Sequence, residues 1–379
     1  MLVVGGAVLR VGIVPAEVCP PVTPAQIEAS IEEAVGWIAR GMTADGRYTY
    51  GYDRGADEVN RGYNGPRHAG VTMSLYQVYA VTGSDEALAA ADRGLAFALD
   101  GMFTHEGFTA WDVLGEVNTG ANGLLLAGLA IRRAATGDAT HDDLMRGMGK
   151  FLLVQQYPDD SVSGYWHRST ATSDPIYGTY STGEASWALA LLDRAFPGEG
   201  WGEAAARTVD YMATERDRRE GRITRLPDHW AAYTLSELRP DLLTDARMDY
   251  ARQLAGYFGM RLRFEAQRRG DGINLALRWF PGPPAGVGTA GEGIGALWQL
   301  ADDSRLVDLK PNIEERVICT AGFMAQRQVG AAEASSAPRP GLQQGAWFYR
   351  GYTQMDDQQH VLSSLLAALT LMESREDPT

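Results

Sequence analysis

Helix-length segments with one apolar face recur along the chain, and they alternate with polar loops that are rich in aromatic residues. The first segment has the clearest start, because Thr23 fits an N-cap, Pro24 the first helical position and Gln26 the capping-box position. Apolar residues then recur at helical spacing at Ile27, Ile31, Val35 and Ile38. A helix is therefore predicted from this start to about residue 42.

Twelve helices are predicted in this way, and they fall into two sets of six. The helices that follow mostly long loops, here called the inner helices, are predicted at 67–81, 119–135, 182–195, 228–238, 289–301 and 356–372. The others, here called the outer helices, are predicted at 24–42, 85–102, 138–156, 201–219, 243–267 and 311–329. Alternating pairs of this kind predict an all-α ring of six helical hairpins, an (α/α)6 toroid.

The long loops are predicted to lie at one end of this ring and to carry short strands. In the first of them, residues 47–52 alternate with tyrosines on one face, which is typical of a strand. Similar helix openings at 119–121, 182–184 and 289–292 indicate repeated hairpins within one domain. We therefore expect a single toroid domain at residues 23–379 and an N-terminal tail at 1–22.

The N-terminal tail has two interpretations, and both bear on localisation. Residues 1–16 are apolar except for Arg10, which fits either the remnant of a signal sequence or anchor, or a loosely docked tail. No stretch of 18 uncharged apolar residues is present, so no transmembrane span is predicted. An exported or cell-envelope location is favoured over the cytoplasm.

Composition narrows the choice of partners. The 379 residues are 45% apolar and 22% charged, as in a globular protein, and the net charge is −14. Such a surface repels nucleic acid, so no nucleic-acid partner is predicted. Two cysteines do not make a disulfide framework, and Cys319 in an apolar run is predicted to be a buried free thiol.

Acidic residues gather at the predicted starts of the inner helices. These starts point positive dipole ends and unpaired N–H groups toward one cavity, where carboxylates are stabilised. Capping of the helices is the alternative explanation for any one of them. The residues predicted to supply a catalytic acid and base are Glu184, Asp228, Glu292 and Asp356.

Further residues near these starts are predicted to bind a substrate. Arg67 is suited to an anionic group, or alternatively to the loop carboxylates Asp53, Asp57 or Glu58. Asp356 shares a helix face with His360 and is placed to orient it. The full predicted binding set is Tyr63, Asn64, Arg67, His68, Asp112, Trp166, His229, Trp230, Trp279, Trp347, Asp357, Gln359 and His360.

No metal or cofactor is predicted. His68 and His360 are expected on adjacent inner helices near Asp356, but His229 is expected across the cavity, and no HExxH spacing occurs. The chain also lacks a glycine-rich phosphate loop and a GxSxG nucleophile elbow.

The alternating helices, the inner Gly-Glu openings and the aromatic long loops resemble the six-hairpin (α/α)6 toroid superfamily over about residues 23–375. This group includes glycoside hydrolases, polysaccharide lyases and sugar epimerases, and no motif of a single family is matched. Lanthionine cyclases and terpene cyclases are similar in shape, but this chain lacks the cysteine pair of the first and the repeated motifs of the second.

The resemblance implies a glycan or oligosaccharide substrate. Hydrolysis of a glycosidic bond is the leading expectation, with two carboxylates about 6.5–9.5 Å apart for inversion or about 5–5.5 Å for retention. A lyase or epimerase acting on a uronate is the first alternative, with a histidine or tyrosine removing a proton and Arg67 holding the carboxylate. A noncatalytic glycan- or protein-binding toroid is the second. Neither the sugar, the linkage, the stereochemical outcome nor the oligomeric state follows from the sequence.

Overall fold

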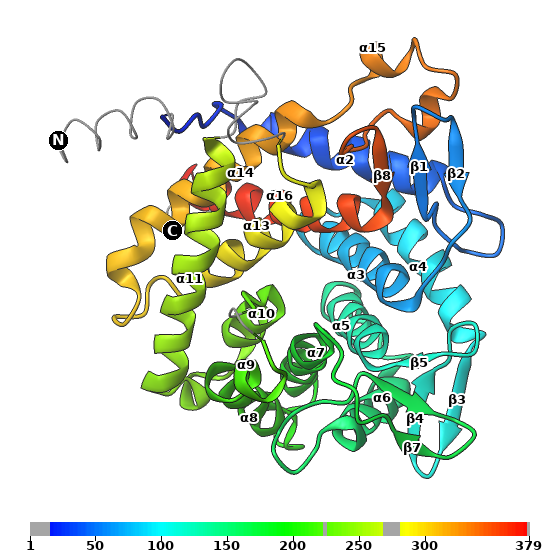
Figure 1. The fold of residues 1–379 in the computed structure, drawn as a ribbon, viewed down its shortest axis with the longest axis vertical. Helices are drawn as coiled ribbons and strands as arrows, with labels where there is room; N and C mark the ends of the chain where they lie inside the picture. The colour runs from blue at the N-terminus through cyan, green and yellow to red at the C-terminus, as the bar shows by residue number, and fades with distance from the viewer. Residues whose placement is uncertain (1–15, 223–225, 268–280, 377–379) are drawn as a thin grey trace.

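Two concentric rings of helices form the structure, a computed structural model that describes residues 16–222, 226–267 and 281–376 (Figure 1). The inner helices are α3 (Gly65–Thr82), α5 (Thr119–Thr136), α7 (Ser181–Ala195), α10 (His229–Glu237), α13 (Pro284–Trp298) and α16 (Met355–Glu376). The outer helices are α2 (Pro24–Arg40), α4 (Asp85–Leu99), α6 (Asp142–Gln155), α8 (Trp201–Thr214), α11 (Asp245–Ala266) and α14 (Lys310–Arg327). Each inner helix packs against the next, and α16 packs against α3, so the ring closes and the predicted (α/α)6 toroid is confirmed.

Short strands in the long loops, also predicted, form three small antiparallel sheets. They are β1 (Gly51–Asp53), β2 (Glu58–Asn60), β3 (Met102–His105), β4 (Phe108–Trp111), β5 (Val117–Asn118), β6 (Tyr165–His167), β7 (Thr172–Ser173) and β8 (Tyr352–Gln354). Strand β8 pairs with β1 in the register Gly51↔Gln354, so the last long loop is joined to the first across the closure of the ring. The remaining short helices are α9 (Arg216–Arg219), α15 (Ala331–Ala334), η2 (Pro240–Leu242), η3 (Val307–Leu309) and η4 (Pro340–Leu342).

Local sequence explains many of the helix ends. Thr23 caps α2 in the predicted capping box with Gln26, and Asn64 and Asn118 accept hydrogen bonds from the first turns of α3 and α5. Gly83 ends α3 in the left-handed conformation, at φ 70°, which glycine adopts without strain. These residues decide where a helix begins and ends before any tertiary contact forms.

Two predicted boundaries differ most from the structure, and one of them moves a candidate site residue. The outer helix expected at 201–219 ends at Thr214, and a separate turn of helix follows it. Helix α13 begins at Pro284 rather than near 289, since Pro283 and Pro284 fit the start of a helix. Glu292 therefore lies two turns inside α13 and not at its opening.

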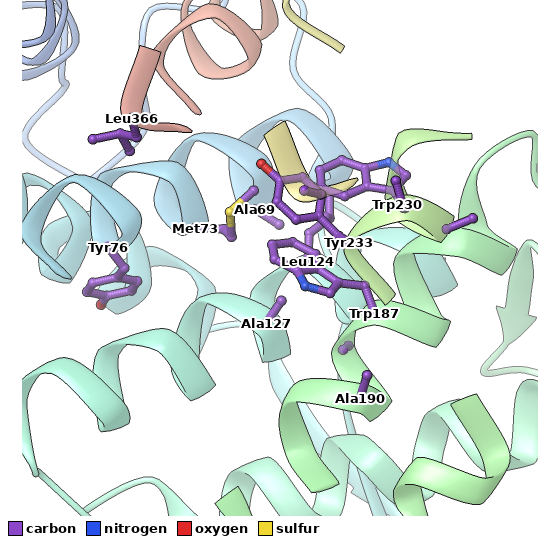
Figure 2. Close-up of a cluster of buried hydrophobic side chains, with 14 of the residues drawn as sticks. Ala69, Met73, Tyr76, Leu124, Ala127, Trp187, Ala190, Trp230, Tyr233 and Leu366 are labelled. Atoms are coloured by element: carbon purple, nitrogen blue, oxygen red, sulfur yellow. The ribbon is translucent and has the colours of Figure 1, made fainter. Parts of the chain in front are cut away.

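The core fills the space between the rings and the centre of the inner ring. Trp187 of α7 stacks on Trp230 and Tyr233 of α10, with ring centroids 5.3 and 4.6 Å apart, and Leu124 of α5 lies beside them (Figure 2). Such stacked aromatic groups bury large apolar areas at the contact between neighbouring helices.

Among the described residues, no helix combines the length and the apolar character needed to cross a membrane.

Inner helices α5 and α7 approach each other closely at Gly123. A Cβ placed there would lie 2.8 Å from the carbonyl oxygen of Glu184, so neighbouring backbone would have to move. We expect Gly123→Ala to lower the free energy of unfolding by about 1–3 kcal/mol. Gly256→Ala is the matched control, because a Cβ at that position of α11 meets no atom within 4 Å and should add about 0.5–1 kcal/mol. Urea denaturation measures both, and equal effects of the two substitutions would contradict the close approach.

The two cysteines form a disulfide, which corrects the expectation of a buried free thiol at Cys319. Cys19 lies in a strap, residues 16–22, that runs over the outer helices α11 and α14. Glu17 in this strap pairs with Arg263 of α11 and Arg316 of α14. The sequence could not indicate this bond, because it joins positions 300 residues apart that only the closed ring brings together.

Candidate active site

A cavity of about 410 Å³, here called the central cavity, lies at the end of the ring where the inner helices begin. Every inner helix supplies at least one residue to its wall, and the 15 residues that line it include charged, aromatic and small side chains. They are Asn64, Pro66, Arg67, Leu124, Tyr180, Glu184, His229, Trp230, Arg261, Ala285, Gly286, Thr289, Asp356, Gln359 and His360. The inner helices therefore bring residues at or near their starts to one cavity, as predicted.

Two histidines face each other in this cavity above a buried carboxylate. His229 begins α10, His360 lies in the second turn of α16, and their ring centroids are 5.2 Å apart at an interplanar angle of 80°. Glu292 of α13 lies between them and is fully buried. Its Oε2 is 2.6 Å from His360 Nδ1 and 3.6 Å from His229 Nε2. His229 was expected across the cavity from His360, but the ring of six helices is narrow enough at its mouth for the two side chains to meet.

The two histidines differ in their electrostatic surroundings. Burial lowers the pKa of His229 well below its ordinary value, and the nearby positive charges of His360 and Arg261 lower it further. Burial also works against protonation of His360, but the carboxylates of Glu292, Asp356 and Asp357 outweigh it and raise the pKa of His360 above its ordinary value. The cavity thus holds one imidazole that resists protonation beside a second, bonded to Glu292, that protonates more readily.

The free nitrogens of the two rings are those a substrate would meet. His229 Nε2 is buried and has no hydrogen-bond partner among the residues that the structure describes. His360 uses Nδ1 for Glu292, and no partner for its Nε2 lies within the described part of the chain. Both histidines therefore border the same small space, each with one ring nitrogen that no described residue bonds.

Glu184 supplies a second acidic group. It lies in the first turn of α7, and Gly120 of α5 makes room for it, since a Cβ at Gly120 would lie 1.8 Å from Glu184 Oε2. Burial, followed by repulsion from Asp228, raises the pKa of Glu184 to about 8. Its carboxyl is consequently protonated at neutral pH, and it can donate a hydrogen bond or a proton.

The raised pKa of Glu184 predicts a pH dependence of stability. Between its ordinary pKa of 4.5 and its folded pKa of about 8, the folded chain keeps a proton that the unfolded chain releases. The free energy of unfolding should therefore fall as pH rises through this window, and the stabilisation should be complete only below pH 4.5. Glu184→Gln, which stays neutral, should flatten that slope in urea titrations at a series of pH values. Parallel curves for the two proteins would contradict the assignment.

Asp228 is occupied by structural contacts. Its Oδ2 is 2.5 Å from Arg216 Nη1, and its Oδ1 accepts from the backbone N–H of Trp230, which caps α10. Both charged side chains are buried. This candidate catalytic carboxylate is not among the residues that line the central cavity, although it lies directly behind His229 and Glu184.

Arg67 and Asp356 line the cavity as an ion pair. Arg67 Nε lies 3.0 Å from Asp356 Oδ2, and Arg67 also donates to the hydroxyl of Tyr50. The loop carboxylates considered as its partners are not the ones it binds. Asp356 is thus tied to Arg67, and Glu292, not Asp356, orients His360.

Several predicted binding residues lie away from the central cavity. His68 is fully buried, its Nδ1 is 2.6 Å from the Tyr63 hydroxyl, and its Nε2 donates to the carbonyl oxygen of Gly94. Asp357 accepts from the backbone N–H groups of Ala285 and Gln354. Three more predicted residues have other partners. Asp112 pairs with Arg168, and Trp166 packs on Phe103 and Phe108. Trp347 donates to the carbonyl oxygen of Met324. Trp279 lies outside the described residues.

Tyr180 and Arg261 also line the cavity but were not predicted as site residues. Tyr180 directly precedes α7, so its place before a predicted inner helix was a usable signal. Arg261 lies on the outer helix α11, and its long side chain reaches inward beside Gly286. No local pattern marks an outer-helix residue of this kind.

The His229–Glu292–His360 cluster also has the composition of a metal site, since its ligand atoms lie within 4.8 Å of one another. The 2.6 Å between His360 Nδ1 and Glu292 Oε2 is a hydrogen-bond distance. Ligand atoms around tetrahedral zinc are about 3.3 Å apart for bonds of roughly 2.0 Å. We therefore interpret the cluster as an acid–base set.

Comparison with known proteins identifies the class of fold. No protein-family model and no curated protein matches the chain. Similar solved structures include the cellobiose 2-epimerase of Spirochaeta thermophila DSM 6192, with 11% identity, a TM-score of 0.67, and coverage of 93% of this chain and 97% of that chain. A GH76 α-mannanase of Bacteroides thetaiotaomicron matches at 11% identity and TM-score 0.63, over 93% and 97%. An unsaturated glucuronyl hydrolase specific for heparin matches at 12% identity and TM-score 0.60, over 93% and 99%. At such identities the likeness is one of fold: the chain is an (α/α)6 toroid.

Proposed function

We propose that this chain is a carbohydrate-active enzyme that moves a proton at the carbon next to a sugar carbonyl, as a sugar epimerase or isomerase. The observation that carries the proposal is the pair His229 and His360 in one cavity, with ring centroids 5.2 Å apart and Glu292 bonded to His360. Their pKa values are shifted in opposite directions, downward for His229 and upward for His360. General acid–base catalysis needs such a pair within reach of the same substrate atoms. The cellobiose 2-epimerase, which this chain resembles in fold, adds support for the substrate class.

The proposed step balances without any further reactant. In the open-chain sugar, His229 Nε2 takes the proton from C2, the C–H electrons form the C1=C2 bond, and the carbonyl electrons move to O1. His360 then gives its Nε2 proton to O1, so an enediol forms. For the epimer, the enediol turns its other face to His229, which returns the proton to C2 while O1 gives its proton back to His360 and the C1=O1 bond re-forms. For the ketose, His229 gives the proton to C1 while the O2 proton passes to His360 and the C2=O2 bond forms. Protonated Glu184 is placed to donate a hydrogen bond to a sugar oxygen.

Hydrolysis of a glycosidic bond is the second candidate, and the raised pKa of Glu184 favours it. A neutral carboxyl at pH 7 is what a glycosidase needs to protonate a leaving oxygen. Its partner would come from the other predicted carboxylates. Of these, Asp356 lines the cavity, whereas Asp228 and Glu292 are held by Arg216 and His360. Because Asp356 is the one predicted partner that lines the cavity, and it is paired with Arg67, hydrolysis is the weaker of the two hypotheses.

Incubation with reducing sugars in D₂O tests the proposal and separates the alternatives. An epimerase or isomerase incorporates deuterium at C2 or C1 and forms a sugar of the same length, as read by NMR and chromatography. A hydrolase shortens oligosaccharides without labelling their carbon atoms. A lyase acting on a uronate forms an unsaturated product, whose conjugated double bond absorbs at about 235 nm. Binding of a glycan with no chemical change would favour the noncatalytic toroid. That result, hydrolysis alone or lyase activity alone would each overturn the proposal.

A further inference from the structure

A second cavity lies beside the central cavity, and the mechanism above does not use it. Its volume is about 320 Å³, and it is lined by 11 residues of the first long loop, six between Gly41 and Tyr50 and the five from Val59 to Tyr63. Tyr50 stands between the two cavities: its ring lines the second one, and its hydroxyl accepts from Asn64 and Arg67, which line the central one. A molecule that fills the central cavity and extends past Tyr50 would therefore enter the second cavity.

The walls of the second cavity suit one sugar ring. Tyr50 and Tyr63 lie side by side with centroids 6.1 Å apart and an interplanar angle of 46°, so both offer faces or edges to the space between loops. The volume is at the lower end of the range of about 300–1,000 Å³ for small-molecule sites. Aromatic walls of this kind pack against the C–H faces of sugars, and the neighbouring polar groups can bind hydroxyls.

The charged side chains that line the second cavity are both positive. Arg47 and Arg61 line it, and no aspartate or glutamate does. Arg47 is already paired with Asp45, at 2.9 Å, and lies over the ring of Tyr63. Arg61 is exposed, and within the described part of the chain it makes neither an ion pair nor a side-chain hydrogen bond. The guanidinium of Arg61 is thus left to meet a ligand.

The backbone on both sides of Arg61 is fixed. Asn60 pairs with Gly51 at the end of β2, its side-chain amide donates to the hydroxyl of Tyr352, and its Oδ1 accepts from the N–H of Gly62. A Cβ at Gly62 would lie 3.2 Å from the Tyr50 ring, so this turn is packed against the wall of the cavity. Arg61 is therefore presented from a fixed turn, and binding need not first order a loose loop.

We propose that the second cavity is a subsite for an acidic sugar, a uronate residue next to the reacting sugar, whose carboxylate pairs with Arg61. The subsite proposal rests on the proposed function in one respect: the neighbouring sugar is the one that occupies the central cavity. The whole chain has a net charge of −14, so long-range attraction does not explain binding of an anion here. The local guanidinium, which binds carboxylates through two parallel hydrogen bonds, would supply the selectivity.

Equilibrium binding to the full chain tests the subsite without any turnover. The probes are glucuronyl-hexose disaccharides and the hexosyl-hexose disaccharides that differ from them only at the carboxylate, measured by titration calorimetry. A charge-assisted contact should make the acidic disaccharide bind roughly tenfold tighter at low salt, and the preference should shrink as salt is added. Arg61→Gln should remove the preference and leave the affinity for the neutral disaccharide unchanged.

Arg218→Gln is the matched control, since it removes the same charge from an exposed arginine of α9 that lines neither cavity. It should keep the full preference of the unmodified protein. Equal affinities for the two disaccharides, or a preference that survives Arg61→Gln, would overturn the subsite while leaving the proposed function standing. Failure of both kinds of disaccharide to bind would remove the subsite and the proposed function together.

Discussion

Replacing His229 with asparagine is expected to lower the turnover of an aldose by roughly 10²–10⁴-fold, the usual contribution of a general base. His229 is the neutral imidazole of the central cavity, and its Nε2 has no hydrogen-bond partner in the part of the chain that the structure describes. Loss of deuterium incorporation at C2 in D₂O would report the missing proton transfer directly. The melting temperature should fall somewhat, because the buried imidazole packs on Trp230 and His360, so turnover is compared per folded molecule.

His68→Gln is the matched control for this prediction. His68 is also buried near the start of an inner helix, but it lies between Tyr63 and Gly94 and outside the central cavity. Its replacement should lower stability and leave most of the turnover per folded molecule. If His68→Gln abolishes turnover and His229→Asn does not, the site is misassigned.

The largest loss of stability is expected from Arg216→Met. Arg216 is buried and holds Asp228 at 2.5 Å, and Asp228 in turn is fully buried at the start of α10. Removing one partner of a buried ion pair leaves an unpaired charge, at a cost of about 3–5 kcal/mol. Urea denaturation should show this as a lower midpoint with an unchanged slope.

A second substitution separates the ion pair from simple packing. In Arg216→Met/Asp228→Asn the unpaired charge is gone, so part of the lost stability should return. Arg218→Gln, two residues away but exposed, should change the free energy of unfolding by no more than about 0.5 kcal/mol. An Arg216→Met protein as stable as the unmodified one would show that Asp228 finds another partner or a proton.

Much of the fold could be predicted because its signals are local. The apolar period of the helices, the capping box at Thr23 and the unequal loops were enough for twelve helices and their order in the ring. The errors at the end of α8 and the start of α13 arose where local rules compete, as between Pro284 and the later Thr289. Because of the second error, Glu292 was expected at the start of the helix and not two turns inside it.

The candidate site was predicted in outline and not in detail. Glu184, His229, Asp356, Gln359 and His360 were named as site residues, and all line the central cavity. Their roles were not foreseen, because roles depend on partners. Glu292 was named as a helix-start carboxylate, whereas it lies buried between two histidines and contributes most to raising the pKa of His360.

The sequence by itself determined the helices, their alternation and the end of the ring at which polar side chains gather, since spacing and capping act over a few residues. Only the tertiary structure decided which of these side chains meet. The contact of His229 with His360, the Arg67–Asp356 pair and the Cys19–Cys319 bond join residues 131, 289 and 300 positions apart. Such contacts depend on how narrowly the ring closes, and that follows from the packing of all six inner helices at once.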